Sequence, residues 1–138
     1  MKKMILGVAV LLIASTTPAQ ELKKGNVVGT HIAAVKLQPG VTMEQFTEFY
    51  VKRVIPEAEK SRPGWKIYPV RRIRGEKAEG FGIIMVVASE ADRDKYYNAD
   101  GTDSELGKAA NAKIQPILDL LNKLGTFSSD VFTDWLVY

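Results

Sequence analysis

Hydrophobic and polar positions change their period several times along the chain, and each period predicts one kind of element. Residues 27–37 are rich in β-branched and small apolar residues and end at a Gln-Pro-Gly turn, which predicts a strand. Residues 65–74 alternate as a second strand, and residues 81–88 form a third that is almost entirely apolar. The polar residues 75–80 between them predict a hairpin. Residues 127–138 close the chain as a fourth predicted strand.

Helical periods separate these strands. Thr42 and Gln45 have the spacing of a capping box, so a first helix is expected to begin at Met43. Its apolar residues recur at three- and four-residue intervals, and we expect the helix to bend or end near Pro56. Pro63 then marks a definite break before the second strand.

Two further helices are expected before the last strand. Ser89 caps a short charged helix that is predicted to hold Tyr96 and Tyr97. A longer helix runs to about Leu124, and Gly125 suits the left-handed position just past its end. The order β-α-β-β-α-α-β predicts an α+β, ferredoxin-like fold, in which a four-stranded antiparallel sheet carries helices on one face. Because the first and third strands have two apolar faces, a twofold dimer whose sheets close into a barrel is expected to cover the other face.

The chain begins with the pattern of an export signal. Lys2 and Lys3 precede an unbroken apolar run, residues 4–14, and small residues follow it. We therefore expect residues 1–19 to be a cleavable signal peptide and residues 20–138 to be one domain, located in the periplasm or outside the cell. The apolar run would cover only about half of a ~30 Å hydrocarbon core, so no membrane anchor is expected after cleavage.

Charge and composition remove several classes of partner. The chain has 19 basic and 16 acidic residues, and removing Lys2 and Lys3 leaves 17 against 16. A cluster of Arg71, Arg72 and Arg74 is too small to replace a broad basic surface, so a nucleic-acid partner is not expected. With no Cys and a single His in the sequence, neither a disulfide nor a metal site is predicted, and no cofactor is implied.

Two segments resemble known families. Residues 31–45, with His31, an aliphatic run, a Lys, a Gly and a Thr before the first helix, resemble the opening of stress-responsive dimeric A/B barrel (Dabb) domains. Residues 50–56 resemble a helix end of the ethyl tert-butyl ether degradation (EthD) and NIPSNAP groups, where Tyr-x-x-His-x-x-Pro is frequent and Arg53 here replaces the His. The resemblance implies a dimeric α+β barrel, a superfamily that includes lyases, cyclases and monooxygenases. Some members carry Tyr-x-x-His-Pro-x-His after the third strand, whereas residues 96–102 contain no His, which excludes a two-His mechanism.

Candidate site residues follow from chemistry and from this resemblance. His31 has an ordinary pKa near 6.5, and in the resembling domains its strand position points into the cleft between sheet and helices, where it would be a general base or a ligand contact. The alternative is a hydrogen-bonded core His. Further candidates for ligand binding are aromatic or cationic: Tyr50, Arg53, Trp65, Tyr68, Arg72 and Tyr97. The aromatic members could equally be simple core, and the arginine of the second strand a solvated edge residue. Asp134 could face outward or pair with an inward Arg.

Two hypotheses about function remain from the sequence. The first is an exported homodimer that binds a small apolar or aromatic molecule between the helices and the sheet, with His31 and a Tyr orienting it. The second is a cofactor-independent monooxygenase, isomerase or lyase, in which His31 removes a proton from an acidic carbon while a Tyr or Arg stabilises the enolate. The second hypothesis requires His31 to lie beside a cavity and near another polar group.

Overall fold

A computed structural model of the chain describes residues 21–74 and 80–138. The predicted signal peptide and most of the predicted polar connection lie outside these residues. The elements, in chain order, are β1 (Val27–Leu37), α1 (Met43–Phe49), the π-helical turn η1 (Tyr50–Val54), α2 (Ile55–Ser61), β2 (Lys66–Arg71), β3 (Phe81–Val87), α3 (Glu90–Asp94), α4 (Glu105–Leu121) and β4 (Gly125–Leu136).

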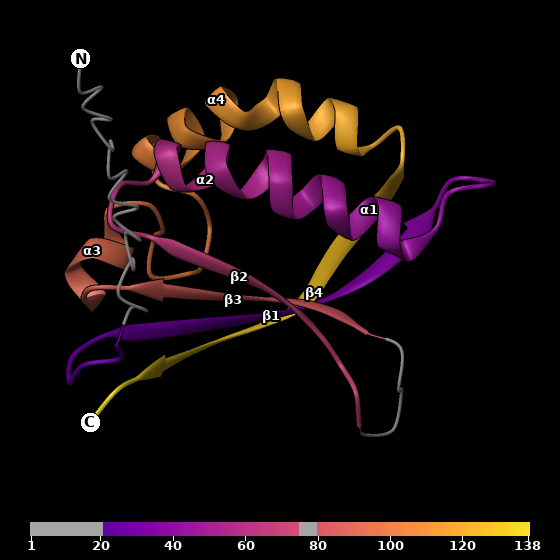
Figure 1. Cartoon of the computed structure of the whole chain (residues 1–138). Coiled ribbons are helices and arrows are strands. Elements are labelled where there is room, and N and C mark those ends of the chain that lie inside the picture. The colour runs from indigo at the N-terminus through magenta and orange to yellow at the C-terminus, as the bar shows by residue number, and fades with distance from the viewer. Residues whose placement is uncertain (1–20, 75–79) are drawn as a thin grey trace, which may run out of the picture.

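The four strands form one antiparallel sheet in the order β2-β3-β1-β4. The α1–α2 segment and α4 lie side by side over one face of this sheet, and α3 lies at one end of it (Figure 1). The predicted ferredoxin-like α+β fold is therefore confirmed. The predicted hairpin of β2 and β3 is also present, with Lys66 opposite Val86 and Arg71 opposite Phe81.

The first helical segment begins as expected but runs further. The backbone N–H of Gln45 donates to the Thr42 hydroxyl at 3.2 Å, and the Gln45 side chain accepts from the Thr42 N–H at 2.9 Å, which completes the capping box at Met43. The helix does not end at Pro56, because η1 inserts a wider turn just before it and α2 continues to Ser61. A proline in the first turn of a helical segment removes no needed donor.

Two local predictions are wrong. Tyr96 and Tyr97 lie after α3 rather than in it, because the chain turns away at Lys95 and Tyr97 forms an isolated bridge with Asp103. Gly125 does not have a positive φ. It begins β4, where a Cβ would lie 2.9 Å from the Lys36 carbonyl oxygen, so this glycine permits close approach of two strands.

Side chains on the helical face of the sheet build the core. In β1 every second residue points toward the helices, and Ala33 packs there against Phe46, Phe81 and Leu121. A second, smaller cluster at the α3 end of the sheet contains Trp65, Val87, Tyr96 and Ala110. The molecule thus has a continuous core under α1–α2 and a separate aromatic cluster beside α3.

A register shift divides β4 into two halves. Val131 is opposite Ile32 but Ser129 is opposite Ala33, so β4 contains one extra residue at this point. Because side chains alternate along a strand, the extra residue lets Phe127 and Phe132 both face the helices although they are five positions apart.

The close contact between α4 and the segment after α3 gives a first test. A Cβ at Gly107 would overlap the backbone carbonyl oxygen of Tyr96. Gly→Ala inside a helix ordinarily stabilises by about 1 kcal/mol, but we expect Gly107→Ala to lower the free energy of unfolding by about 1–3 kcal/mol, because a backbone clash must be relieved. Urea denaturation measures this change, and a gain in stability would show that the contact is absent.

Candidate functional site

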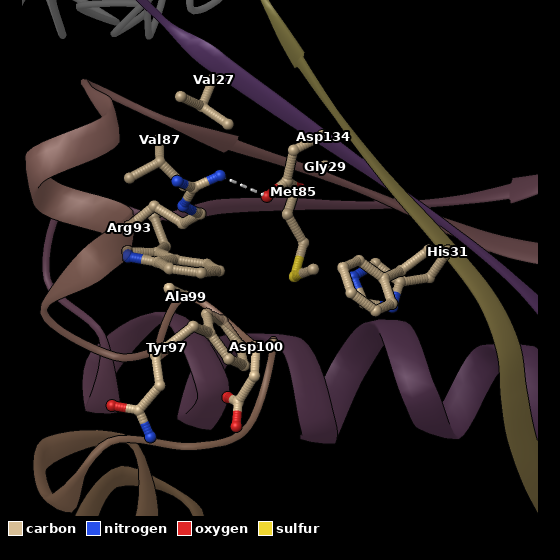
Figure 2. A pocket seen from close by; sticks show the side chains of 14 residues that line it. Val27, Gly29, His31, Met85, Val87, Arg93, Tyr97, Ala99, Asp100 and Asp134 are labelled. Carbon is tan, nitrogen blue, oxygen red and sulfur yellow. Dashed lines mark hydrogen bonds and ion pairs between the residues drawn. The ribbon is translucent and has the colours of Figure 1, made fainter.

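A cavity of about 240 Å³ lies on the helical face of the sheet, at the end where α3 packs. Its floor is formed by alternate residues of the three strands β1, β3 and β4, and its roof by α3 and the loop that follows. Floor residues that matter below are Gly29, His31, Met85, Phe132 and Asp134, and roof or wall residues are Trp65, Arg93, Tyr97 and Asp100. Figure 2 shows His31 at one end of the cavity and Arg93 at the other, with Met85 between them.

His31 contributes an imidazole to this cavity from the middle of β1. It is half-buried and stacks on Phe132 of β4, with ring centroids 5.9 Å apart and planes inclined by 23°. Burial lowers the pKa of His31 below its ordinary 6.5, and the charge of Asp134 partly offsets this effect. At neutral pH the imidazole is therefore uncharged and able to accept a proton.

An ion pair stands opposite this imidazole. Arg93 Nη1 donates to Asp134 Oδ2 at 2.7 Å (Figure 2). Arg93 Nε donates to Asp94 Oδ1 at 2.8 Å. These two carboxylates raise the pKa of Arg93. Gly29 makes room for the pair, because a Cβ at that position would lie 3.1 Å from Asp134 Oδ1.

The aromatic wall rests on a buried cation, Arg62. This side chain is 6% exposed, and its guanidinium lies 5.9 Å from the centroid of Trp65 and 5.8 Å from that of Tyr96. Its Nη2 donates to Asn111 Oδ1, and Asn111 Nδ2 donates to Asp103 Oδ2 at 2.7 Å. The cation thereby connects the end of α2 with α4 and with the loop that borders the cavity.

Tyr97 forms part of the same wall. Its ring lies 5.8 Å from that of Trp65, and burial raises the pKa of its hydroxyl. Trp65 is 3% exposed, and neither its Nε1 nor Arg62 Nε has a hydrogen-bond partner within the described part of the chain. The wall is therefore held by ring packing and by the Arg62 network.

The loop after Tyr97 closes the remaining side. Asp100 Oδ1 accepts hydrogen bonds from Thr102 N at 3.0 Å and Thr102 Oγ1 at 2.6 Å, and Asn98 N–H donates to the Thr102 carbonyl at 2.8 Å. Gly101 has φ +81°, and a Cβ there would lie 2.9 Å from Phe132 Cζ. Tight internal bonding and this close approach fix the loop against the floor.

Of the residues that the sequence suggested for a site, the structure brings three together. His31, Trp65 and Tyr97 line the cavity. Their binding and catalytic roles stay predictions, but the three side chains border the same cavity.

The other four candidates lie elsewhere. Tyr50 is buried in the main core, edge-on to Phe81 and Phe127, and burial raises the pKa of its hydroxyl. Arg53 lies 5.9 Å from the Phe49 ring, beside a shallow groove between the helices. Tyr68 is exposed on the face of the sheet away from the helices. Arg72 borders a hollow at the other end of the sheet.

Sequence analysis missed two arginines and left one carboxylate undecided. Arg93 looked like one more charge on a short polar helix, and Arg62 like an ordinary residue before a Pro-Gly break. The sequence allows Asp134 to face outward or to pair with an inward Arg, and in the structure it pairs with Arg93. The register shift in β4, which sets the face on which Asp134 lies, has no sequence signal that we can identify.

Two features are absent from the described residues. Across residues 21–74 and 80–138, no three His, Cys, Asp or Glu side chains gather to hold a metal ion. In the same residues, no helix is both long enough and apolar enough to cross a membrane.

Comparisons with known proteins find likeness only among solved structures, and only at low sequence identity. No protein-family model matches the chain, and no curated protein is similar to it in sequence. Among solved structures, SnoaB, a cofactor-independent oxygenase from Streptomyces nogalater, is similar at 14% identity and a TM-score of 0.47, covering 83% of this chain and 94% of its own. An ethyl tert-butyl ether degradation family protein from Bacillus halodurans has 18% identity and a TM-score of 0.39, covering 78% and 96%. A dimeric ferredoxin-like protein from Thermobifida fusca, of unknown function, has 17% identity and a TM-score of 0.37, covering 86% and 99%. A likeness at these TM-scores is evidence for neither the fold, the activity nor the assembly of this chain.

The single imidazole allows a direct test of the site. We expect His31 to titrate below 6.5 because burial disfavours its charged form, and Asp134→Asn to lower its pKa further by removing a nearby negative charge. Since the folded pKa lies below the unfolded one, stability is full above 6.5 and is lost as the pH falls from there toward the folded pKa. NMR titration of the imidazole protons measures the His31 pKa in the wild-type protein and in Asp134→Asn. A pKa above 6.5 would contradict the buried placement of His31.

Proposed function

We propose that this protein binds a small organic molecule in the cavity beside His31. The observation that carries the proposal is the combination of an apolar floor and aromatic walls with a few converging polar groups. Such a combination is typical of small-ligand sites, in which apolar surface provides affinity and polar groups fix orientation. At about 240 Å³ the cavity exceeds the ~150 Å³ that accommodates benzene in a protein interior, so one aromatic ring with a short substituent fits.

The cavity can be tested by filling it. Ala99 lines the cavity from the loop, so we expect Ala99→Trp to abolish ligand binding by occupying the space. Ala109→Trp, an exposed position on α4, is the matched control and should bind normally. The measurement is an NMR titration with single-ring fragments, in which the His31 imidazole signals report occupancy. Equal responses from wild type and Ala99→Trp would place binding somewhere else.

Export and dimerisation belong to the same proposal. Export is supported by Lys2, Lys3 and the apolar run after them. Dimerisation is supported by the sheet face that no described helix covers (Figure 1). This outer face exposes large apolar side chains on three strands: Ile32, Tyr68, Val70, Val131 and Trp135. An apolar patch of this kind is typical of an interface, and a second copy would close the two sheets into the dimeric α+β barrel that the sequence resemblance implies.

A charge on the outer face tests the dimer. Trp135 is 60% exposed, and we expect Trp135→Glu to weaken self-association at least about 30-fold, because a carboxylate would be buried without a partner. Leu106→Glu, at a 48% exposed residue of α4, should leave association unchanged. Sedimentation equilibrium measures both constants. A wild-type protein that stays monomeric at micromolar concentration would refute the dimer without touching the cavity.

One observation favours an enzyme as the second candidate. His31 is uncharged, borders a cavity and faces Asp134 and Arg93 across it, so a base, a carboxylate and a cation share one pocket. A ligand with an acidic C–H bond could lose a proton to the imidazole while the Tyr97 hydroxyl, whose raised pKa keeps it protonated, donates a hydrogen bond to the enolate oxygen. Proton abstraction is the step that a monooxygenase, isomerase or lyase without cofactor would share.

Proton abstraction can be measured without knowing the natural substrate. Phenylacetone in deuterated buffer should exchange its α-protons in the presence of the protein, and His31→Gln should slow this exchange by about 10²-fold if His31 is the base. With Asp119→Asn, a change at an exposed position of α4, phenylacetone should exchange its protons at the wild-type rate. If phenylacetone binds but exchanges no faster with wild type than with His31→Gln, the protein is a binding protein.

A further inference from the structure

Electrostatic asymmetry around the cavity restricts what it can bind. Among the described residues that line it, two are carboxylates and one is a guanidinium: Asp100 and Asp134 against Arg93. Lys95 and Asp92 form an ion pair, with Nζ 2.5 Å from Oδ1, so their charges cancel. His31 is uncharged at neutral pH because burial lowers its pKa. The excess charge at the cavity is therefore negative.

The guanidinium inside the cavity is already neutralised. Arg93 donates to Asp134 and to Asp94, so an anionic ligand would have to compete with two carboxylates for this cation. Displacing Asp134 would leave a partly buried carboxylate without its partner, which is costly. The pair thus disfavours a carboxylate or phosphate ligand, although an isolated arginine would favour one.

Asp100 supplies the uncompensated negative charge. Its Oδ1 accepts two hydrogen bonds from Thr102, and within the described part of the chain no basic side chain lies at ion-pair distance from it. These bonds hold the carboxylate at the rim and lower its pKa. Figure 2 shows Asp100 and Asp134 on opposite sides of the cavity, so that a group between them faces a carboxylate on either side.

Aromatic rings line the space between these carboxylates. Trp65, Tyr97 and Phe132 all border the cavity. A cation over the face of such rings is attracted by their quadrupole, and aromatic enclosures are known binding sites for ammonium groups. The chain already uses this chemistry next to the cavity, because the Arg62 guanidinium packs against the rings of Trp65 and Tyr96.

We propose that the ligand of this cavity is a small organic cation, an ammonium group joined by a short chain to one aromatic ring. The ammonium lies near Asp100 and the Tyr97 ring, and the ligand's ring lies over Met85 against the stacked His31 and Phe132. This assignment rests on the proposed function, since it names the ligand class of the same cavity. The volume of about 240 Å³ limits the ligand to one ring with a few attached atoms.

Three probes of one shape and different charge test the assignment. They are 2-phenylethylammonium, 2-phenylethanol and 3-phenylpropanoate, titrated into the wild-type protein at neutral pH and low salt with the His31 imidazole signals as the readout. We expect the ammonium to bind at least about fivefold more tightly than the alcohol, and the carboxylate to bind most weakly. Raising the salt concentration should lower the affinity for 2-phenylethylammonium and leave the affinity for 2-phenylethanol unchanged.

Asp100→Asn identifies the residue responsible. An amide oxygen can still accept from Thr102, so the loop keeps its turn while the charge is lost. We expect ammonium affinity to fall roughly threefold to fivefold and alcohol affinity to stay the same. Asp119→Asn makes the same chemical change on the exposed side of α4 and should alter neither. If Asp100→Asn does not fold, the salt dependence and the three-probe order decide alone.

The outcomes separate the two proposals. An alcohol or carboxylate that binds as tightly as the ammonium, with the response lost in Ala99→Trp, would overturn the cation assignment and leave the cavity as a ligand site. If none of the three probes perturbs His31, or if Ala99→Trp responds as wild type does, the cavity is not the ligand site and both proposals fail. The ammonium binding most tightly, with Asp100→Asn removing its advantage, is the supporting result.

Discussion

The end of the molecule that contains the cavity depends on a buried positive charge. Arg62 follows α2, packs between Trp65 and Tyr96, and bonds to Asn111 of α4, which in turn bonds to Asp103. Burying a guanidinium away from water is costly unless hydrogen bonds and ring faces replace its hydration. Arg62 has these partners only when α2, α4 and the loop before α4 are all in place. Its burial therefore couples the positions of these three segments and fixes the Trp65 and Tyr96 rings.

The cavity exists because small residues occupy places where a core would have large ones. Gly29 leaves space in the floor that the Asp134 carboxylate enters to reach Arg93, and Gly101 allows the loop to approach the Phe132 ring. Farther along the same strands, Ala33 and Phe127 belong to a filled core under α1–α2. The two ends of the sheet therefore differ: the end under α1–α2 is a filled apolar core, and the end beside α3 contains a cavity lined by charged side chains. This division explains why polar groups are tolerated beside a sheet that is otherwise apolar.

The element order, the capping box at Thr42 and the hairpin of β2 and β3 could be predicted because each depends on residues close together in sequence. His31 could be named as a candidate for a different reason, because it is the single imidazole of the chain. Tyr50 could not be separated from Tyr97, because an aromatic residue has the same spacing whether it fills a core or lines a cavity. Arg62 and Arg93 escaped notice because their partners are 49 and 41 positions away, and only the tertiary fold brings those partners near.

The register shift in β4 has a consequence for comparing this chain with distant relatives. Phe127 belongs to one alternation of the strand, and Phe132 and Asp134 belong to the other, with the extra residue between Ser129 and Val131. An alignment that runs through β4 without a gap would pair the cavity residues of this chain with outward-facing residues of a straight-stranded homologue. Such an alignment would compare residues that lie on opposite faces of the sheet. Placing the gap at residue 130 would restore the correspondence between residues that face the same side of the sheet.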